Sequence, residues 1–215
     1  MDASIVKSVW SKYGSDEPYW SVLTDPKFKK SNINDNNHKN EFWLSGQGDV
    51  SWIKSLIDLK AFVNPKVLDY GCGVGRLTHA WENAEGCDIS EPHLVIARQD
   101  YPDRIFHLIE PGDCPGGYDI IFSLIVLQHN RPSLMEKCFT NILRALNTNG
   151  IAVLHAPYYI QAVHHSDSVM EMNYLPIETV ASIAQREGAI ILGCNKDRDM
   201  CGGEIKNCTY IIKKN

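Results

Sequence analysis

The chain has 215 residues, of which 44% are hydrophobic and 22% charged, a composition typical of a soluble globular protein with a sizeable core. Its length fits one domain with an extension. The formal net charge of −5 and the short apolar runs disfavour both a nucleic-acid-binding and a membrane-spanning protein. Asp2 lies close to the amino terminus and no apolar run follows it, so we expect no secretory signal.

Residues 1–64 show helical spacing of apolar residues and no strand alternation. The helical pattern appears around Trp10 and again after a polar loop at residues 31–40, and every tryptophan except Trp81 lies in this segment. We therefore predict an N-terminal helical cap or lid over residues 1–64, packed on a second domain formed by residues 65–215.

From residue 66 onward, short apolar runs alternate with helical patterns. The expected helices cover residues 76–84, a segment that starts at Ser90, residues 135–146 and residues 177–187. The expected strands cover residues 66–69, 85–88, 105–109, 118–123, 151–154, 189–192 and 208–212. This alternation predicts an α/β fold, in which helices cover both faces of a mostly parallel sheet. The last two strands are joined by a loop with Gly202 and Gly203 and no helix, so we expect them to be antiparallel.

The seven cysteines are scattered and form no CxxC pair. We expect free thiols in a reducing cytoplasm rather than a disulfide framework. Cys194, Cys201 and Cys208 are spaced more widely than the roughly two to four residues typical of a zinc knuckle, so thiols in the core or in loops are the favoured interpretation.

The first expected strand of the second domain ends in a glycine-rich turn, Gly71-Cys-Gly-Val-Gly75, and a helix begins at Arg76. Glycines are needed where the backbone takes positive φ or where a ligand approaches closely, and a tight packing turn is the alternative. The third glycine of the dinucleotide fingerprint would fall at Arg76, and no Gly-Lys-Ser/Thr follows. The spacing therefore disfavours a nicotinamide site and excludes a P-loop.

The run VLDYGCGVGR, residues 67–76, resembles the first motif of class I S-adenosylmethionine-dependent methyltransferases. Residues 118–129 resemble the fourth strand of that family and the turn after it, and residues 143–157 resemble its helix, turn and fifth strand. The resemblance covers residues 65–215. It implies a Rossmann-like, seven-stranded, mostly parallel sheet with an antiparallel last strand, which binds S-adenosylmethionine (SAM) and releases S-adenosylhomocysteine (SAH).

The resemblance also implies roles for individual residues. Asp88 is expected to accept hydrogen bonds from the ribose hydroxyls, with a solvated loop acid as the alternative. Asp69 is expected to order the glycine loop or to meet the amino-acid end of the cofactor, and Asp113 to read the adenine amino group. The other candidates for cofactor contact are Gly71, Cys72, Gly73, Arg76, Ile89, Ser123 and Leu124, with Tyr13 and Gly46 from the N-terminal segment.

A hydroxyl acceptor must lose its proton during methyl transfer, so a group that titrates near neutrality is the natural base. His129 is the first candidate, His155 the second, and His164 and His165 follow; capping a helix or closing the pocket is the alternative role of His129. The fourth strand lacks the acid of metal-dependent catechol methyltransferases and the Asn/Asp-Pro-Pro-Tyr motif of DNA methyltransferases. We therefore expect no metal and no nucleic-acid substrate.

Residues 10–20 and 42–46 resemble the lead-in of some bacterial small-molecule and glycan methyltransferases. We thus expect a cytoplasmic methyltransferase that acts on a small-molecule acceptor, such as a hydroxyl of a glycan-precursor sugar or of a secondary metabolite. The alternative is a catalytically silent domain of the same fold that binds SAM or a partner protein. The sequence leaves the choice between oxygen and nitrogen open, together with the oligomeric state.

Overall fold

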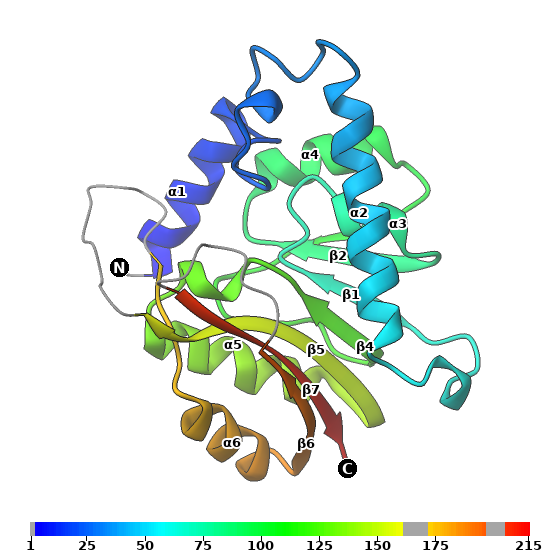
Figure 1. The fold of residues 1–215 in the computed structure, drawn as a ribbon, viewed down its shortest axis with the longest axis vertical. Coiled ribbons are helices and arrows are strands. Elements are labelled where there is room, and N and C mark those ends of the chain that lie inside the picture. The colour runs from blue at the N-terminus through cyan, green and yellow to red at the C-terminus, as the bar shows by residue number, and fades with distance from the viewer. Residues whose placement is uncertain (1–2, 161–171, 197–204) are drawn as a thin grey trace.

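The computed structural model describes residues 3–160, 172–196 and 205–215, which form one sheet with helices on both of its faces (Figure 1). The strand order is β3-β2-β1-β4-β5-β7-β6. Parallel pairing joins β3, β2, β1, β4 and β5, whereas β7 is antiparallel to both β5 and β6. The bounds of the strands are β1 (Val67–Tyr70), β2 (Ala84–Asp88), β3 (Phe106–Leu108), β4 (Tyr118–Ser123), β5 (Leu146–Ile160), β6 (Ala189–Asn195) and β7 (Ile205–Lys214). The predicted Rossmann-like sheet is confirmed, and its strand order reverses between β1 and β4.

The segment before β1 is helical, as predicted. It contains α1 (Ala3–Asp16), the 3-10 helix η1 (Pro26–Phe28), α2 (His38–Ser55) and the 3-10 helix η2 (Leu59–Ala61). In Figure 1, α2 lies across the sheet beside α3 (Arg76–Ala80), and α1 approaches α4 (Glu91–Asp100). This segment therefore packs on the part of the sheet that carries the glycine loop.

The two faces of the sheet have separate apolar cores. On one face, α5 (Pro132–Ala145) buries the stripe that its sequence predicted, which includes Met135, Phe139 and Ile142. On the other face, Val50 and Ile53 of α2 pack with Trp81 and Phe122, whose rings stack at 5.2 Å. Side chains alternate between the two faces along each strand, so a single strand contributes to both cores.

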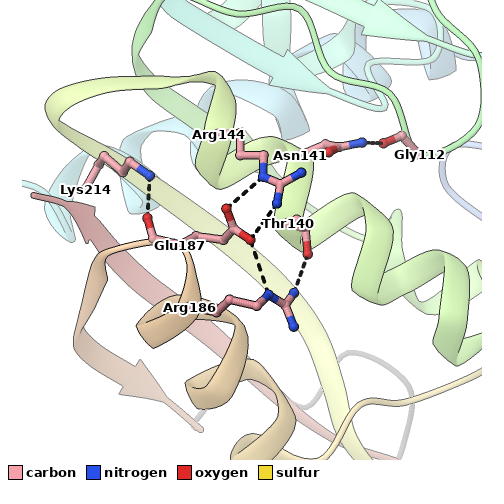
Figure 2. Close-up of polar contacts among 7 residues, drawn as sticks. All are labelled: Gly112, Thr140, Asn141, Arg144, Arg186, Glu187 and Lys214. Carbon is pink, nitrogen blue, oxygen red and sulfur yellow. Dashed lines mark hydrogen bonds and ion pairs between the residues drawn. The ribbon is translucent and has the colours of Figure 1, made fainter.

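Ion pairs at Glu187, the residue after α6 (Ile177–Arg186), join α6 to α5, and a hydrogen bond joins Glu187 to β7 (Figure 2). The Glu187 carboxylate accepts two hydrogen bonds from Arg144, at 2.7 and 3.0 Å, and one from Arg186 at 3.3 Å. Lys214 donates to the Glu187 carbonyl. Further along α5, the Asn141 amide donates to the Gly112 carbonyl at 2.9 Å, which fixes the loop between β3 and β4 against α5.

β5 and β7 exceed their predicted lengths the most, and β6 extends to Asn195 where residue 192 was the expected end. β5 begins at Leu146, directly after α5, because Leu146 pairs with Tyr118 and the polar residues after it continue the strand, with Asn149 at φ 64°. β7 begins at Ile205 and includes the polar residues Asn207 and Thr209, because β5 supplies backbone partners along its whole length. Backbone pairing with a neighbouring strand, rather than hydrophobicity, sets these ends.

The cysteine prediction needs one correction, because Cys194 and Cys208 form a disulfide. Cys194 pairs with Tyr210 across β6 and β7, so Cys208 lies diagonally opposite, and the two Cα atoms are 5.9 Å apart, within disulfide range. The thiols of Cys72, Cys87, Cys114 and Cys138 are free. Cys201, Gly202 and Gly203 lie outside the described residues, as do His164 and His165.

No helix in the described parts of the chain combines the length and the apolar content that a membrane span requires.

Candidate functional site

The glycine loop follows β1 and has a backbone that only glycine adopts easily. Gly71, Gly73 and Gly75 have φ of 79°, 54° and 87°. A Cβ on Gly71 would lie 2.5 Å from a methyl carbon of Val126, and a Cβ on Gly73 would lie 2.8 Å from one of Val22. The positive φ that the sequence indicated is therefore present at all three glycines, whereas the close approach at Gly71 and Gly73 is to valine side chains, which is the packing role left as the alternative.

Asp88, the last residue of β2, lies against this loop. Its Oδ2 accepts the Gly73 backbone N–H at 2.9 Å, and its Oδ1 accepts the Ser90 N–H at 2.8 Å. Since each carboxylate oxygen has two lone pairs, both oxygens retain the capacity to accept one more hydrogen bond. The arrangement suits a ligand with two neighbouring hydroxyl groups.

Asp69 is buried, with 2% of its surface exposed, and the Thr78 hydroxyl donates to its Oδ2 at 2.7 Å. Burial raises the pKa of the Asp69 carboxyl to about 7, although the Thr78 hydrogen bond and the Arg76 charge favour the ionised form. The pocket therefore contains an acid that changes charge near neutral pH.

A pocket opens where β1, β2 and β4 end, at the point where the strand order reverses, which is the expected ligand position in such sheets. The predicted site residues that line it are Asp69, Gly71, Cys72, Gly73, Arg76, Asp88, Ile89, Leu124 and His129. The glycine loop, the strand-end acid and the first candidate base thus share one pocket.

The Arg76 guanidinium bridges the loop to α2. This side chain is buried, and its terminal nitrogen contacts the Asp49 carboxylate at 2.8 Å and the Ser45 hydroxyl at 3.1 Å. Gly46 lies at the same crossing, where an added Cβ would be 2.5 Å from the Arg76 carbonyl oxygen. Gly46 permits close packing of α2 on α3 and is not among the residues that line the pocket.

Four other predicted residues also lie outside the pocket lining, namely Ser123, Asp113, Tyr13 and His155. Ser123 is buried and donates to the Tyr70 carbonyl at 2.9 Å, which joins β4 to β1. Asp113 is exposed, and its carboxylate pairs with Lys137 of α5 at 2.9 Å. The ring of Tyr13 lies 5.9 Å from the ring of Trp10.

His155 is buried in β5, where it pairs with Thr209 of β7. The second candidate base therefore lies further along the sheet than His129, which belongs to the 3-10 helix η3 (Leu127–His129) after β4.

The N-terminal segment contributes lining residues that sequence reasoning missed: Trp10, Ser21 and Val22. The Trp10 ring meets the His129 ring edge-on, with centroids 5.3 Å apart. The aromatic content of the segment was a signal for this contact, but nothing in the sequence singled out Ser21.

His93 of α4 also lines the pocket and was not predicted from the sequence. It connects the N-terminal segment to Ser90, whose N–H donates to Asp88. The Ser90 hydroxyl donates to the Trp10 carbonyl at 3.1 Å, so it accepts from Nδ1 of His93 at 2.8 Å. Nε2 of His93 then contacts the Ser21 hydroxyl at 2.9 Å. Burial lowers the pKa of His93, which favours its neutral form.

The remaining missed lining residues are Tyr70 of β1, Leu77 of α3, Cys138 of α5 and a set that follows β3 and β4. They include Ile109, Pro111 and Gly112 on one side, and Ile125, Val126 and Asn130 on the other. Ile125 has φ of 61°, an outlier for a β-branched residue, and strain of this kind is concentrated at functional sites. Within the described residues, no group of three or more His, Cys, Asp or Glu side chains could hold a metal ion.

One comparison with known protein families gives a match. Residues 67–150 match the family described as "Methyltransferase domain". A search of curated proteins finds no match to this sequence.

Solved structures share the fold at low sequence identity. Magnesium protoporphyrin IX methyltransferase (ChlM) from Synechocystis PCC 6803, solved with SAH, is 17% identical, with 100% of both chains covered and a TM-score of 0.69. CalS10, an amino pentose methyltransferase from Micromonospora echinaspora solved with SAM, is 13% identical over 79% of this chain and 92% of its own, with a TM-score of 0.61. The [4+2]-cyclase SpnF is 15% identical over 70% of this chain and 74% of its own, with a TM-score of 0.54.

The glycine loop and Asp88 fit an adenosyl cofactor, because the backbone of Gly71 and Gly73 lines the pocket beside the acid, which retains two acceptor positions for vicinal hydroxyls. Together with the match of residues 67–150 to a methyltransferase domain and the fold shared with SAM-bound and SAH-bound methyltransferases, they indicate a methyltransferase domain that uses SAM and produces SAH.

Proposed function

We propose that the enzyme transfers the methyl group of SAM to a hydroxyl of a small-molecule acceptor, in the class of glycan-precursor sugars or secondary metabolites. The observation that carries this proposal is the sharing of one pocket by Asp88, the glycine loop and His129. The similarity to CalS10, an amino pentose methyltransferase, supports a sugar-like acceptor. The net charge of −5 argues against nucleic acid as the acceptor.

In this proposal, Asp88 accepts the two ribose hydroxyls, and the loop from Gly71 to Gly73 lies along the backbone of the cofactor. Asp69 faces the amino-acid end, where its ionised form would attract the ammonium group. Ile89 and Leu124 supply apolar surface. We do not assign direct cofactor contacts to Asp113, Ser123, Tyr13 or Gly46, because they lie outside the pocket lining.

When bound, SAM supplies an electrophilic methyl group that requires alignment and dehydration of the acceptor more than activation. His129 is the proposed base, which removes the acceptor proton as the new bond forms. The Trp10 ring contacts the His129 ring edge-on, and Leu124 adds an apolar side chain to the lining of the same pocket.

We propose further that residues 1–64 act as a cap over the pocket, while residues 65–215 bind the cofactor. The support is the chain of hydrogen bonds from Ser21 through His93 and Ser90 to the Trp10 carbonyl. It holds the cap beside Asp88, whose Oδ1 accepts the Ser90 N–H.

The test is methyl incorporation from methyl-labelled SAM into a panel of sugars, nucleotide sugars and phenols. We expect at least one acceptor to be methylated, and His129→Ala to lower turnover by roughly 10²–10⁴-fold while SAH affinity stays unchanged. His38→Ala is the matched control, because that ring contacts the Asn32 carbonyl away from the pocket lining.

Full activity of His129→Ala would move the role of base to another group, such as His155. Binding of SAM without methylation of any acceptor would instead favour the second candidate, a cofactor-binding domain without methyl transfer. The fold similarity to SpnF, a [4+2]-cyclase, is the observation that supports that candidate.

A further inference from the structure

Beyond the pocket, the end of β5 and the start of β7 form a buried polar face. The antiparallel register pairs His155 with Thr209 and Pro157 with Asn207, so these side chains point to the same side of the sheet. Asn207 is 3% exposed and Thr209 is 1% exposed.

The polar atoms of these two β7 residues lack hydrogen bonds. In the described part of the chain, no group pairs with Nδ2 or Oδ1 of Asn207, or with Oγ1 of Thr209, although all three atoms are inaccessible to solvent. More than nine in ten buried polar groups in proteins are satisfied, because an unsatisfied one retains its full desolvation cost. Two neighbouring side chains with this defect indicate groups that pair with something other than the described residues.

This face adjoins the pocket. The parallel register between β4 and β5 pairs Ser123 with Leu154, so Leu124, which lines the pocket, is level with His155. Thr209 lies directly across from His155 on the next strand. The polar face therefore lies on β5 and β7 beside the part of the pocket wall that Leu124 contributes.

The chemistry of the face matches a neutral polyol. An asparagine amide offers two donors and one acceptor oxygen, and a threonine hydroxyl offers one donor and acceptor positions, which complements neighbouring hydroxyl groups. Neither side chain carries a charge that would select an anion. A flat aromatic acceptor would leave these atoms unpaired, and sites with buried polar groups reject such ligands strongly.

We propose that Asn207 and Thr209 form the part of the acceptor site that binds the non-reacting hydroxyls of a sugar, with His155 between them and the pocket. This inference rests on the proposed function and names its substrate class, a neutral polyhydroxylated acceptor rather than a phenol.

A stability comparison tests whether these groups are unpaired in the protein alone. Thr209→Val keeps the shape and removes the unpaired hydroxyl, so we expect the melting temperature without added ligand to rise. Thr140→Val is the matched control, because the Thr140 hydroxyl accepts from Arg186 at 3.0 Å (Figure 2), and its loss should lower the melting temperature. A lower melting temperature for Thr209→Val would mean that water or the chain already satisfies the group, and would overturn the inference.

The binding test uses the side-chain amide resonance of Asn207, which is assigned by its absence from Asn207→Leu. D-glucose, D-mannose, L-rhamnose and catechol are titrated separately, with and without SAH. We expect at least one sugar to shift the resonance saturably, catechol to leave it unchanged, and Thr209→Val to weaken sugar binding by about tenfold. A resonance that no sugar shifts, or that catechol shifts more, would overturn the inference.

The two proposals fail in different ways. Methyl incorporation into catechol alone would keep the proposed methyl transfer and overturn the sugar site. Absence of SAH binding in calorimetry would overturn the proposed function, whereas a sugar-dependent shift of Asn207 without SAH would still support the polyol site.

Discussion

The backbone N–H of Gly73 donates to Oδ2 of Asp88 at 2.9 Å, so the glycine loop after β1 and the acid at the end of β2 form one unit. The Gly71 and Cys72 N–H groups reinforce it, because both donate to the Cys87 carbonyl, at 2.8 and 3.0 Å. The loop therefore orients the carboxylate of Asp88, which would hold the ribose in the proposed complex. A change on either side of this contact should affect cofactor binding.

Asp88→Ala should weaken SAH binding by about 1–3 kcal/mol, because the ribose hydroxyls lose a charged acceptor. The fold should survive, since Asp88 lies at a strand end rather than in the apolar core. Asp113→Ala is the matched control, because that carboxylate pairs with Lys137 outside the pocket lining and should leave the affinity unchanged. Isothermal calorimetry measures both variants, and parent-like affinity of Asp88→Ala would refute the ribose assignment.

Gly73→Ala should destabilise the fold by about 1–2 kcal/mol and weaken cofactor binding, because φ of 54° is costly for alanine and its Cβ would lie 2.8 Å from Val22. Gly48→Ala is the comparison, since nothing lies within 4 Å of its added Cβ and the residue is in the interior of α2. That variant should stabilise the fold by about 0.5–1 kcal/mol. Urea unfolding of the pair measures the difference, and equal effects would contradict the strained-loop account.

His93→Ala should raise the KM for SAM while the fold remains intact, because it breaks the buried contacts from Ser90 and Ser21 that hold the cap beside Asp88. His93→Gln should recover part of the loss, since its amide can replace one of the two hydrogen bonds. Steady-state kinetics with varied SAM tests this, with thermal unfolding as the control for stability. A change in kcat alone, with KM unchanged, would argue against the cap.

The raised pKa of the Asp69 carboxyl should make the stability of the fold depend on pH. Its pKa is raised by burial from its ordinary value of 3.8 to about 7, so the folded state binds this proton more tightly than the unfolded state. The contribution to stability is therefore fully present below the unfolded pKa and is lost as pH rises through about 7. Between about pH 5 and about pH 8, the parent should lose about 3 kcal/mol relative to Asp69→Asn. Urea unfolding at both pH values measures the difference, and parallel pH profiles would contradict it.

Local chemistry made part of the site predictable from the sequence. Gly71 and Gly73 mark a turn that needs positive φ, and Asp88 follows a strand expected to end beside that turn, so their meeting at one sheet edge follows from the order of the strands. The same logic placed His129 at the pocket. The strand pattern likewise predicted the sheet, apart from the extra length that β5 gains from pairing with β4 and β7, and that β7 gains from pairing with β5.

Contacts between distant segments were not predictable. Ser21 and His93 are far apart in the sequence, and only the packing of the N-terminal segment on α4 brings them within 2.9 Å. Tertiary packing also brings Asp113 beside Lys137 of α5, so the Asp113 carboxylate pairs with that lysine. The positive φ of Ile125 opposes its own local preference, so tertiary packing must impose it.

The structure of the complex with SAH tests the central claim most directly. The account predicts that the ribose hydroxyls lie within hydrogen-bonding distance of both Asp88 oxygens, that the SAH backbone follows the loop from Gly71 to Gly73, and that the sulfur faces Leu124 and His129. SAH bound elsewhere, or in this pocket with its ribose away from Asp88, would contradict it.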